Sequence, residues 1–294
     1  MHMIKIGNIE VTRIEEVMLV EQPTSFADFR PELIADIRDW LLPNHYDEKS
    51  NTFIISVHSW LLRTPDRIIL IDTASGNGKT RPLSPRLNML NTPYLDRLKA
   101  AGVAPEDVDT VIHTHLHVDH VGWNTYWDGD RWVPTFPKAT TIMSAIAREA
   151  HDPKRGAAAK PLEANLQFSD SVQPILDAGT VRLVDGTETL FPGIELVQAH
   201  GHAPGHMMVR VRAGGREALF IGDVMHQPIQ IAHPTWNSKY CEDPPLARET
   251  RARVLAYCAD ERCLTLPVHF NAPYCGYIER RGGGYTFVPS DEIP

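Results

Sequence analysis

The stretch Thr114-His115-Leu116-His117-Val118-Asp119-His120, THLHVDH, places three imidazoles and one carboxylate on a short segment that follows an apolar run. Residues two apart in extended backbone lie on one face, so His115 and His117 point the same way. Asp119 and His120 are adjacent and point in different directions. Because histidine is a common metal ligand, we predict that this loop reaches two neighbouring metal ions. The alternative is an exposed loop that carries four unrelated polar side chains.

Two metal ions need more ligands than this loop supplies, and three later positions offer them. His202, Asp223 and His269 each come just after an apolar run that has the length of a strand. Strand ends at one edge of a sheet converge on a common crevice in open α/β sheets. We therefore expect these side chains to lie near the THLHVDH loop.

The rest of the chain alternates short apolar runs with turn residues, which favours packed sheets flanked by helices. We expect a single domain over 1–294, with 21–50 as an insertion that packs on the body, forms a lid or contacts a partner subunit. Thr92 is expected to cap the first long helix, with Pro93 in its first turn. Strands are expected at 3–6, 9–14, 53–63, 67–72, 140–143, 181–184, 194–199, 206–212, 217–221, 263–268 and 285–288, and helices at 93–101, 144–151 and 244–259.

Composition narrows the class of protein. The 294 residues carry a net charge of −8 and no run of Lys and Arg, which disfavours nucleic acid as a partner. No apolar run approaches the roughly 18 residues of a membrane span, and the first residues lack the features of a leader, so we expect a cytoplasmic protein without membrane contacts. Free thiols are expected, rather than a disulfide set or a structural zinc site, at Cys241, Cys258, Cys263 and Cys275.

The motif HLHVDH, followed by GHAPGH, GD and PVHF, resembles the metallo-β-lactamase fold superfamily of hydrolases over about residues 50–290. This resemblance implies an α/β (α+β) fold, a four-layer αββα sandwich of two mixed sheets, with a dinuclear metal site at one edge. Zinc is the expected metal, with manganese, iron or cobalt as alternatives. Carried onto this chain, the resemblance puts one ion on His115, His117 and His202, the other on Asp119, His120 and His269, and Asp223 between them.

Four further polar residues have to be placed relative to that site. His200 stands where the family has a proline, and it could be mistaken for the ligand His202. His113 is expected to pack beneath the loop, and His206 to be buried and hydrogen-bonded or to support a ligand. Asp72 follows a strand, where the superfamily often has an aspartate that holds a ligand histidine through its second nitrogen. A simple strand-end cap is the other interpretation of Asp72.

The C-terminal segment HFNAPYCGYIERRGGGYTFVP resembles the branch that contains methyl parathion hydrolase and quorum-quenching N-acyl-homoserine lactonases. Classical lactonases of that branch carry a tyrosine three residues after the bridging aspartate, and here that position is His226. Its imidazole could donate a proton or only line the pocket, and the change leans towards phosphotriesters and esters. The catalytic set is therefore Asp119, Asp223 and His226, with a metal-bridging hydroxide that attacks an ester, lactone or phosphotriester.

Several other functions are compatible with this fold. The first alternative is an N-acyl-homoserine lactonase, followed by a glyoxalase II-like thioesterase that uses Arg280 and Arg281, or a β-lactamase. An iron-dependent oxidoreductase and a non-catalytic metal-binding scaffold complete the set. A homodimer is expected, from the apolar spacing within 21–50 and from the family resemblance. The aromatic residues near the site would form a substrate wall or belong to the core, and they are Trp60, Trp123, Trp127, Phe270 and Tyr274.

Overall fold

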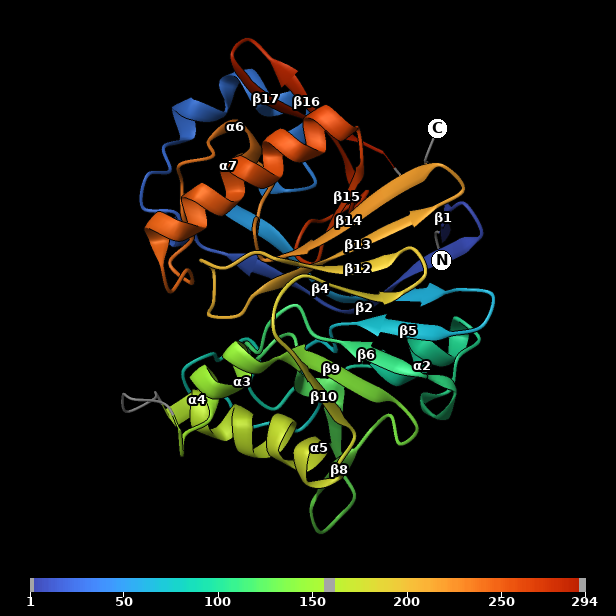
Figure 1. The fold of residues 1–294 in the computed structure, drawn as a ribbon. Helices are drawn as coiled ribbons and strands as arrows, with labels where there is room; N and C mark the ends of the chain where they lie inside the picture. The colour runs from blue at the N-terminus through green and yellow to red at the C-terminus, as the bar shows by residue number, and fades with distance from the viewer. Residues whose placement is uncertain (1–2, 156–161, 291–294) are drawn as a thin grey trace. The chain divides into compact units, whose positions relative to one another are not determined.

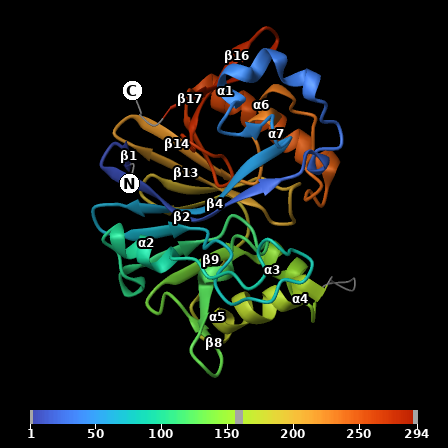
Figure 2. The same ribbon diagram turned by 180° about the vertical axis from the view of Figure 1, so that it is seen from behind.

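A computed structural model describes residues 3–155 and 162–290 (Figure 1 and, from behind, Figure 2). The chain forms two compact units, and each is described by itself. The first unit comprises Met1–Met3, Ile9–Val17 and Val57–Gly186, and the second comprises Ile4–Asn8, Met18–Ser56 and Thr187–Pro294. Among the described residues, no helix combines the length and the apolar character that crossing a bilayer would require.

One mixed sheet has the strand order β1-β2-β4-β5-β6-β9-β10, with the short β3 paired to β4. β4 and β5 are antiparallel, and β5, β6, β9 and β10 run parallel. Ile69 to Ile71 and Thr110 to Ile112 are buried, as is usual for central parallel strands. The strands are β1 (Met3–Ile6), β2 (Ile9–Glu21), β3 (Tyr46–Asp47), β4 (Thr52–Arg63), β5 (Ile68–Ile71), β6 (Thr110–Ile112), β9 (Thr140–Ser144) and β10 (Val181–Val184).

The second sheet has the order β11-β12-β13-β14-β15-β16-β17, and only the pair β14 and β15 is parallel. A separate two-stranded ribbon joins β7 (Thr125–Trp127) to β8 (Trp132–Pro134). The strands of the second sheet are β11 (Glu188–Phe191), β12 (Ile194–Gln198), β13 (Met207–Ala213), β14 (Arg216–Gly222), β15 (Leu264–Pro267), β16 (Gly276–Arg281) and β17 (Gly284–Pro289).

The helices of the first unit pack against the strand ends that carry the THLHVDH loop. Ser144 ends β9 and caps α3, since its Oγ accepts a hydrogen bond from the Ala147 amide at 3.3 Å. Met143, Phe168 and Ile175 are buried in one cluster with Leu116 of the loop itself. The helices, of which α3 to α5 lie together beside β9 and β10 in Figure 1, are α2 (Tyr94–Ala100), α3 (Ala145–His151), α4 (Leu162–Gln167), a π-helical turn at Phe168–Val172 and α5 (Gln173–Asp177).

In the second unit, α7 (Pro244–Glu261) buries Val254 and Leu255 against β14, β16 and β17 (Figure 1). The segment 21–50 forms short helical turns, including α1 (Arg38–Leu41), which lie near α6 (Ile229–Ala232) and β17 (Figure 2). Most of its apolar residues are buried within the unit, although Leu33 is 45% exposed. The buried cluster comprises Phe26, Phe29, Ile34, Ile37, Leu41, Tyr46, Phe53, Ile229 and Trp236.

The expectation of two mixed sheets with helices is confirmed, and the expected strands and helices are present with ends shifted by a few residues. The β2 strand is longer than expected and runs to Glu21. Thr92 does not cap α2, because its hydroxyl and amide both bond to the Asn77 side chain and Pro93 takes the N-cap position. The helical region 162–177, the β7–β8 ribbon, β11 and β16 were not predicted.

A buried ion network joins three segments of the first unit. The Arg81 guanidinium donates two hydrogen bonds to the Asp170 carboxylate, at 2.7 and 2.8 Å. Lys79 Nζ donates to Thr125 Oγ at 2.8 Å and lies 3.7 Å from the centre of the Trp132 ring. Lys79 is fully buried, and this burial lowers its pKa to about 7 although Asp170 acts in the opposite direction. The network fixes the loop after β5 to the β7–β8 ribbon.

Replacing Lys79 with Met is expected to change how stability depends on pH. Between pH 7 and roughly 10.4, the usual pKa of lysine, the unfolded chain holds a proton that folded Lys79 has released. The free energy of unfolding therefore gains up to about 1.4 kcal/mol per pH unit from this residue as the pH rises through that window. Urea unfolding of the metal-free protein at pH 7, 8 and 9 measures the slope. Lys79→Met should lose this contribution, while Lys99→Met, at an exposed site on α2, should keep it; equal slopes in both variants would contradict the prediction.

Candidate metal centre

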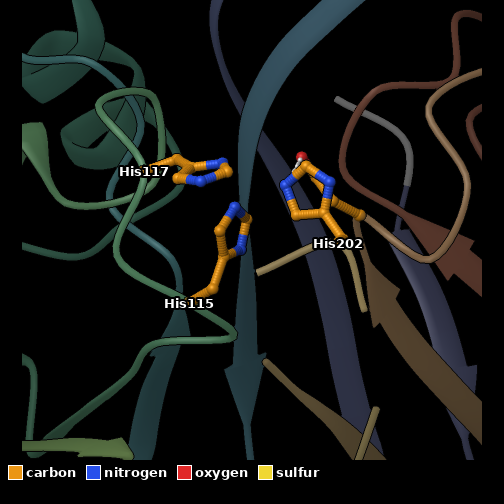
Figure 3. Close-up of side chains that lie close together, drawn as sticks. His115, His117 and His202 are labelled. Carbon is orange, nitrogen blue, oxygen red and sulfur yellow. Dashed lines mark ion pairs between the residues drawn. The ribbon is translucent and has the colours of Figure 1, made fainter. Parts of the chain in front are cut away.

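The three imidazoles of the THLHVDH loop lie together at the end of β6. The ring centre of His115 is 4.5 Å from that of His117 and 4.0 Å from that of His120. Figure 3 shows His115 and His117 with their ring edges turned towards each other. Asp119 is partly exposed, and its Oδ1 lies 3.7 Å from His120 Nε2. These four side chains therefore lie close together at the end of β6 in the first unit.

Asp72 orients this loop from the end of β5. Its carboxylate accepts hydrogen bonds from the Thr114 amide at 2.8 Å and the Thr114 hydroxyl at 2.7 Å, and it lies 2.9 Å from His120 Nδ1. Burial alone would raise the pKa of Asp72, but His120 and His113 hold that pKa below its ordinary value. A carboxylate at Nδ1 fixes the ring so that Nε2 is directed towards a metal. Asp72 therefore supports a ligand histidine and is more than a strand-end cap.

Other buried polar groups hold the backbone of the same loop. The Gln167 side chain, which precedes the π-helical turn, donates to the carbonyl of Leu116, the residue between His115 and His117. The Thr73 amide donates to the His120 carbonyl at 2.7 Å. His113 is buried beneath the loop as expected, with its Nε2 2.9 Å from Asn124 Oδ1. π-Helical turns inside helices are frequent at functional sites, which fits the position of Gln167.

Glu16 of β2 clamps the two segments on either side of the loop. Its carboxylate accepts hydrogen bonds from the Ser75 amide at 2.7 Å, the Gly76 amide at 2.9 Å and Trp123 Nε1 at 2.7 Å. Burial raises the pKa of Glu16, against the effect of these three donors. Gly122 packs so tightly here that a Cβ atom would lie 1.8 Å from the Ser75 carbonyl oxygen. The loop thus rests on a platform that leaves no room for a side chain at position 122.

In the second unit, three imidazoles converge on the carboxylate of Asp223, which follows β14. His202 Nε2 lies 3.2 Å and His226 Nε2 3.3 Å from Asp223 Oδ2, and His269 Nε2 lies 3.3 Å from Asp223 Oδ1. All four side chains are buried. His202, drawn in Figure 3, comes from the loop after β12, and His269 comes after β15. The ends of β12, β14 and β15 therefore bring these residues of the second unit together.

The Nδ1 atoms of His269 and His202 each face a polar group on the other side of the ring. His269 Nδ1 is 2.9 Å from the Ser56 carbonyl oxygen, and His202 Nδ1 is 3.9 Å from Cys241 Sγ. His206 Nε2 accepts a hydrogen bond from the Asp223 amide at 3.0 Å, so this buried histidine supports the aspartate. Neutral imidazoles and a carboxylate that share one buried point suit a divalent metal such as zinc. The donor sets of both units fit metal binding.

Two more predicted residues are placed by the second unit. His200 Nδ1 accepts a hydrogen bond from the Gly205 amide at 3.0 Å, so its ring shapes the turn after β12 while His202 faces Asp223. His226 is stacked on His269, with ring centres 5.9 Å apart and planes 8° apart. Burial lowers the pKa of His226, which favours the neutral ring. His226 therefore belongs to the cluster at Asp223 and not to the surrounding core.

The aromatic residues considered for a substrate wall are divided by their burial. Trp60, Trp123 and Phe270 are buried, and Trp123 stacks on Tyr94 with ring centres 5.3 Å apart. Trp127 of the β7–β8 ribbon is 52% exposed. All four cysteines are buried.

The family model of the metallo-beta-lactamase superfamily matches residues 54–259, which is more than half of the chain. The chain belongs to the metallo-β-lactamase superfamily. The predicted fold class and the prediction of a metal-dependent hydrolase are thereby confirmed. Curated relatives include the N-acyl homoserine lactonase AiiB of Agrobacterium fabrum, 24% identical over 263 residues, which is 84% of this chain and 91% of the relative. The N-acyl homoserine lactonase AiiA of Bacillus thuringiensis subsp. kurstaki is 24% identical over 164 residues, which is 52% of this chain and 56% of AiiA.

Solved structures of this superfamily superpose over nearly the whole chain. The hydrolase AbOPH of the beta lactamase superfamily is 25% identical, with a TM-score of 0.83 over 98% of this chain and 97% of its own. The dizinc quorum-quenching lactonase AidC is 23% identical, with a TM-score of 0.77 over 99% of this chain and 98% of its own. The second likeness shows the shared metallo-β-lactamase fold.

Gly122→Ala is expected to disrupt the first metal-donor cluster, because its Cβ would overlap the Ser75 carbonyl. Backbone must move, and we expect a loss of about 3 kcal/mol in the free energy of unfolding or a comparable loss of metal affinity. Gly284→Ala, where the nearest atom would be 3.8 Å away, is the matched control and should change stability by less than about 0.5 kcal/mol. Urea unfolding and metal content by mass spectrometry measure both. Unchanged stability and metal loading in Gly122→Ala would contradict the tight packing.

Proposed function

We propose that the donor clusters of the two units form one dinuclear site. His115, His117 and His202 would hold one metal ion, Asp119, His120 and His269 the other, and Asp223 would bridge them. Superfamily membership supports this assignment, as does the direction of each ring within its own unit. The observation that carries the proposal is the Asp223 carboxylate, whose two oxygens face different imidazoles. A carboxylate placed in this way could serve as a ligand to two cations.

Two divalent cations, when bound, would supply a water of lowered pKa as nucleophile and polarise the carbonyl or phosphoryl oxygen of the substrate. The protein's own residues then have defined tasks. Asp72 keeps His120 Nε2 directed outward, and Ser56 does the same for His269 through its carbonyl. His226 lies beside Asp223 with its Nε2 also 3.4 Å from Ser238 Oγ, where its ring N–H can donate a hydrogen bond to the leaving oxygen.

A lactone is the substrate class that we propose. Relatives named N-acyl homoserine lactonase match 84% of the chain, which favours ring opening of an acylated lactone over other ester chemistry. A phosphotriester is the second candidate, favoured by one observation: His226 stands where classical lactonases carry a tyrosine. Both substrates are uncharged at the reacting centre and use the same nucleophile, so one site could serve either reaction.

Zinc is the metal that we propose, because five of the six terminal ligands around the bridging carboxylate would be imidazoles and one solved neighbour is a dizinc enzyme. We further propose a cytoplasmic homodimer. The apolar spacing of 21–50 does not supply its interface, since Ile34, Ile37 and Leu41 are buried inside the second unit. The dimer proposal therefore rests on the family resemblance, and light scattering at micromolar concentration tests it.

Asp223→Ala is expected to abolish the proposed activity. Loss of the bridging carboxylate should lower kcat by at least about a thousandfold, as expected when one member of a catalytic unit is lost, and reduce the metal content below two ions per chain. The assay is a panel of N-acyl homoserine lactones, aryl esters and phosphotriesters on zinc-loaded enzyme, with metal counted by mass spectrometry. Asp39→Ala, at an exposed site in the same unit, is the control. Full metal loading with retained turnover in Asp223→Ala would refute the bridging role.

His226→Tyr and His226→Phe differ by one hydroxyl group and separate donation from pocket lining. If the imidazole donates a hydrogen bond to the leaving oxygen, Tyr should keep lactone hydrolysis within about tenfold, while Phe should lower kcat by about a hundredfold with little change in KM. Steady-state kinetics on N-hexanoyl homoserine lactone gives both constants. Equal kcat values for Phe and wild type would show that His226 only lines the pocket.

A further inference from the structure

Arg251 is a buried cation on α7 that donates four hydrogen bonds to the segment 224–237. It is fully buried, and its Nε donates to the Val224 carbonyl at 3.0 Å. Its Nη1 donates to the Pro234 and Trp236 carbonyls, at 2.7 Å each, and its Nη2 to Asn237 Oδ1 at 3.2 Å. Burial lowers its pKa to about 10, so the guanidinium stays charged at neutral pH. These acceptors are neutral oxygens, so the charge is solvated by the segment itself.

Moving a charged group out of water without an ionised partner costs free energy. The burial of Arg251 therefore calls for a structural explanation. Val224 directly follows Asp223, and Trp236 lies at the far end of the loop that carries His226. The Val224, Pro234 and Trp236 carbonyls are bound by two different nitrogens of the guanidinium. The single ammonium of lysine cannot reproduce this planar arrangement of donors. Arg251 therefore joins both ends of the segment 224–237 to the long helix α7.

A second set of hydrogen bonds continues from the same acceptor to His226. Gln230 Nε2 donates to the Trp236 carbonyl at 3.0 Å, which is also an acceptor for Arg251. Gln230 Oε1 accepts from the His226 amide at 2.7 Å and from the Gln227 amide at 3.3 Å. Gln230 is fully buried. The guanidinium thus supports the backbone of His226 through the Gln230 side chain. It supports the backbone of Asp223 through the carbonyl of the following residue, Val224.

We propose that Arg251 is a positioning residue of the metal centre, which sets the orientation of the Asp223 carboxylate and of the His226 ring through the segment 224–237. This inference rests on the proposed function of Asp223 and His226. Arg251 touches no reacting atom in this role. Its loss would leave donors of the right type with the wrong directions, so metal affinity and turnover per folded molecule should fall together.

The test compares Arg251→Lys and Arg251→Met with Arg248→Lys and Arg248→Met, which alter an exposed arginine on the same helix. Circular dichroism and urea unfolding report folding, and competition with a chelator gives zinc affinity. The visible spectrum of the cobalt-substituted protein reports ligand geometry without any substrate. Steady-state kinetics on N-hexanoyl homoserine lactone separates kcat from KM. Asn237→Ala removes one acceptor of Arg251 and is the milder variant if both Arg251 variants fail to fold.

Folded Arg251→Lys should bind zinc 10- to 100-fold more weakly, show a changed cobalt spectrum and lose about tenfold in kcat, with KM within about twofold. Asn237→Ala should shift the same quantities in the same direction by less, and both Arg248 variants should match wild type. Wild-type zinc affinity, spectrum and kcat in a folded Arg251→Lys protein, or in Asn237→Ala where neither Arg251 variant folds, would overturn the proposal. A wild-type protein that binds zinc yet hydrolyses no member of the substrate panel would refute the proposed function, and the zinc and cobalt measurements would still decide the role of Arg251.

Discussion

An imidazole can present only one nitrogen to a metal ion, and the direction of that nitrogen depends on what holds the other. This constraint organises both units of the protein. His120 is held at Nδ1 by Asp72, His269 by the Ser56 carbonyl, and His115 Nδ1 lies 3.1 Å from Thr114 Oγ. His202 Nδ1 has the Cys241 thiol as its neighbour. Asp72 and Thr114 follow β5 and β6, and Ser56 lies within β4, so the first sheet positions three of these four anchors.

Each unit also buries a charged side chain that is hydrogen-bonded mainly to backbone groups. Glu16 is an anion that receives two backbone amides and an indole N–H, and Arg251 is a cation that donates to three backbone carbonyls. In both cases the charge lies beneath a loop that carries metal donors, and a charged hydrogen bond is stronger than a neutral one. The loops gain definition without a regular strand or helix, and a buried charge that lost these partners would be strongly destabilising.

The sequence predicted the donors because they follow local rules. Histidines at spacing two after an apolar run, and polar residues at strand ends, are visible without any long-range information, and the likeness to a known motif assigned their partners. The supports could not be found in this way. Glu16 and Trp123 are 107 positions apart, and Gln167 and Leu116 are 51 apart, with nothing in the intervening sequence that pairs them. Thr92 failed as a cap because Asn77 offered its backbone amide and hydroxyl a better partner, a competition that no local pattern records.

The clearance at Gly122 also limits how this scaffold could change under selection. A position where the smallest side chain would already overlap a backbone oxygen is closed to every other amino acid unless the neighbouring loop is rebuilt with it. In a library that randomises the region around the motif, most variants would carry a side chain at position 122 that does not fit. Any natural descendant of this enzyme that abandons the glycine must first have acquired a compensating change near Ser75, so the order of those two substitutions is fixed in advance.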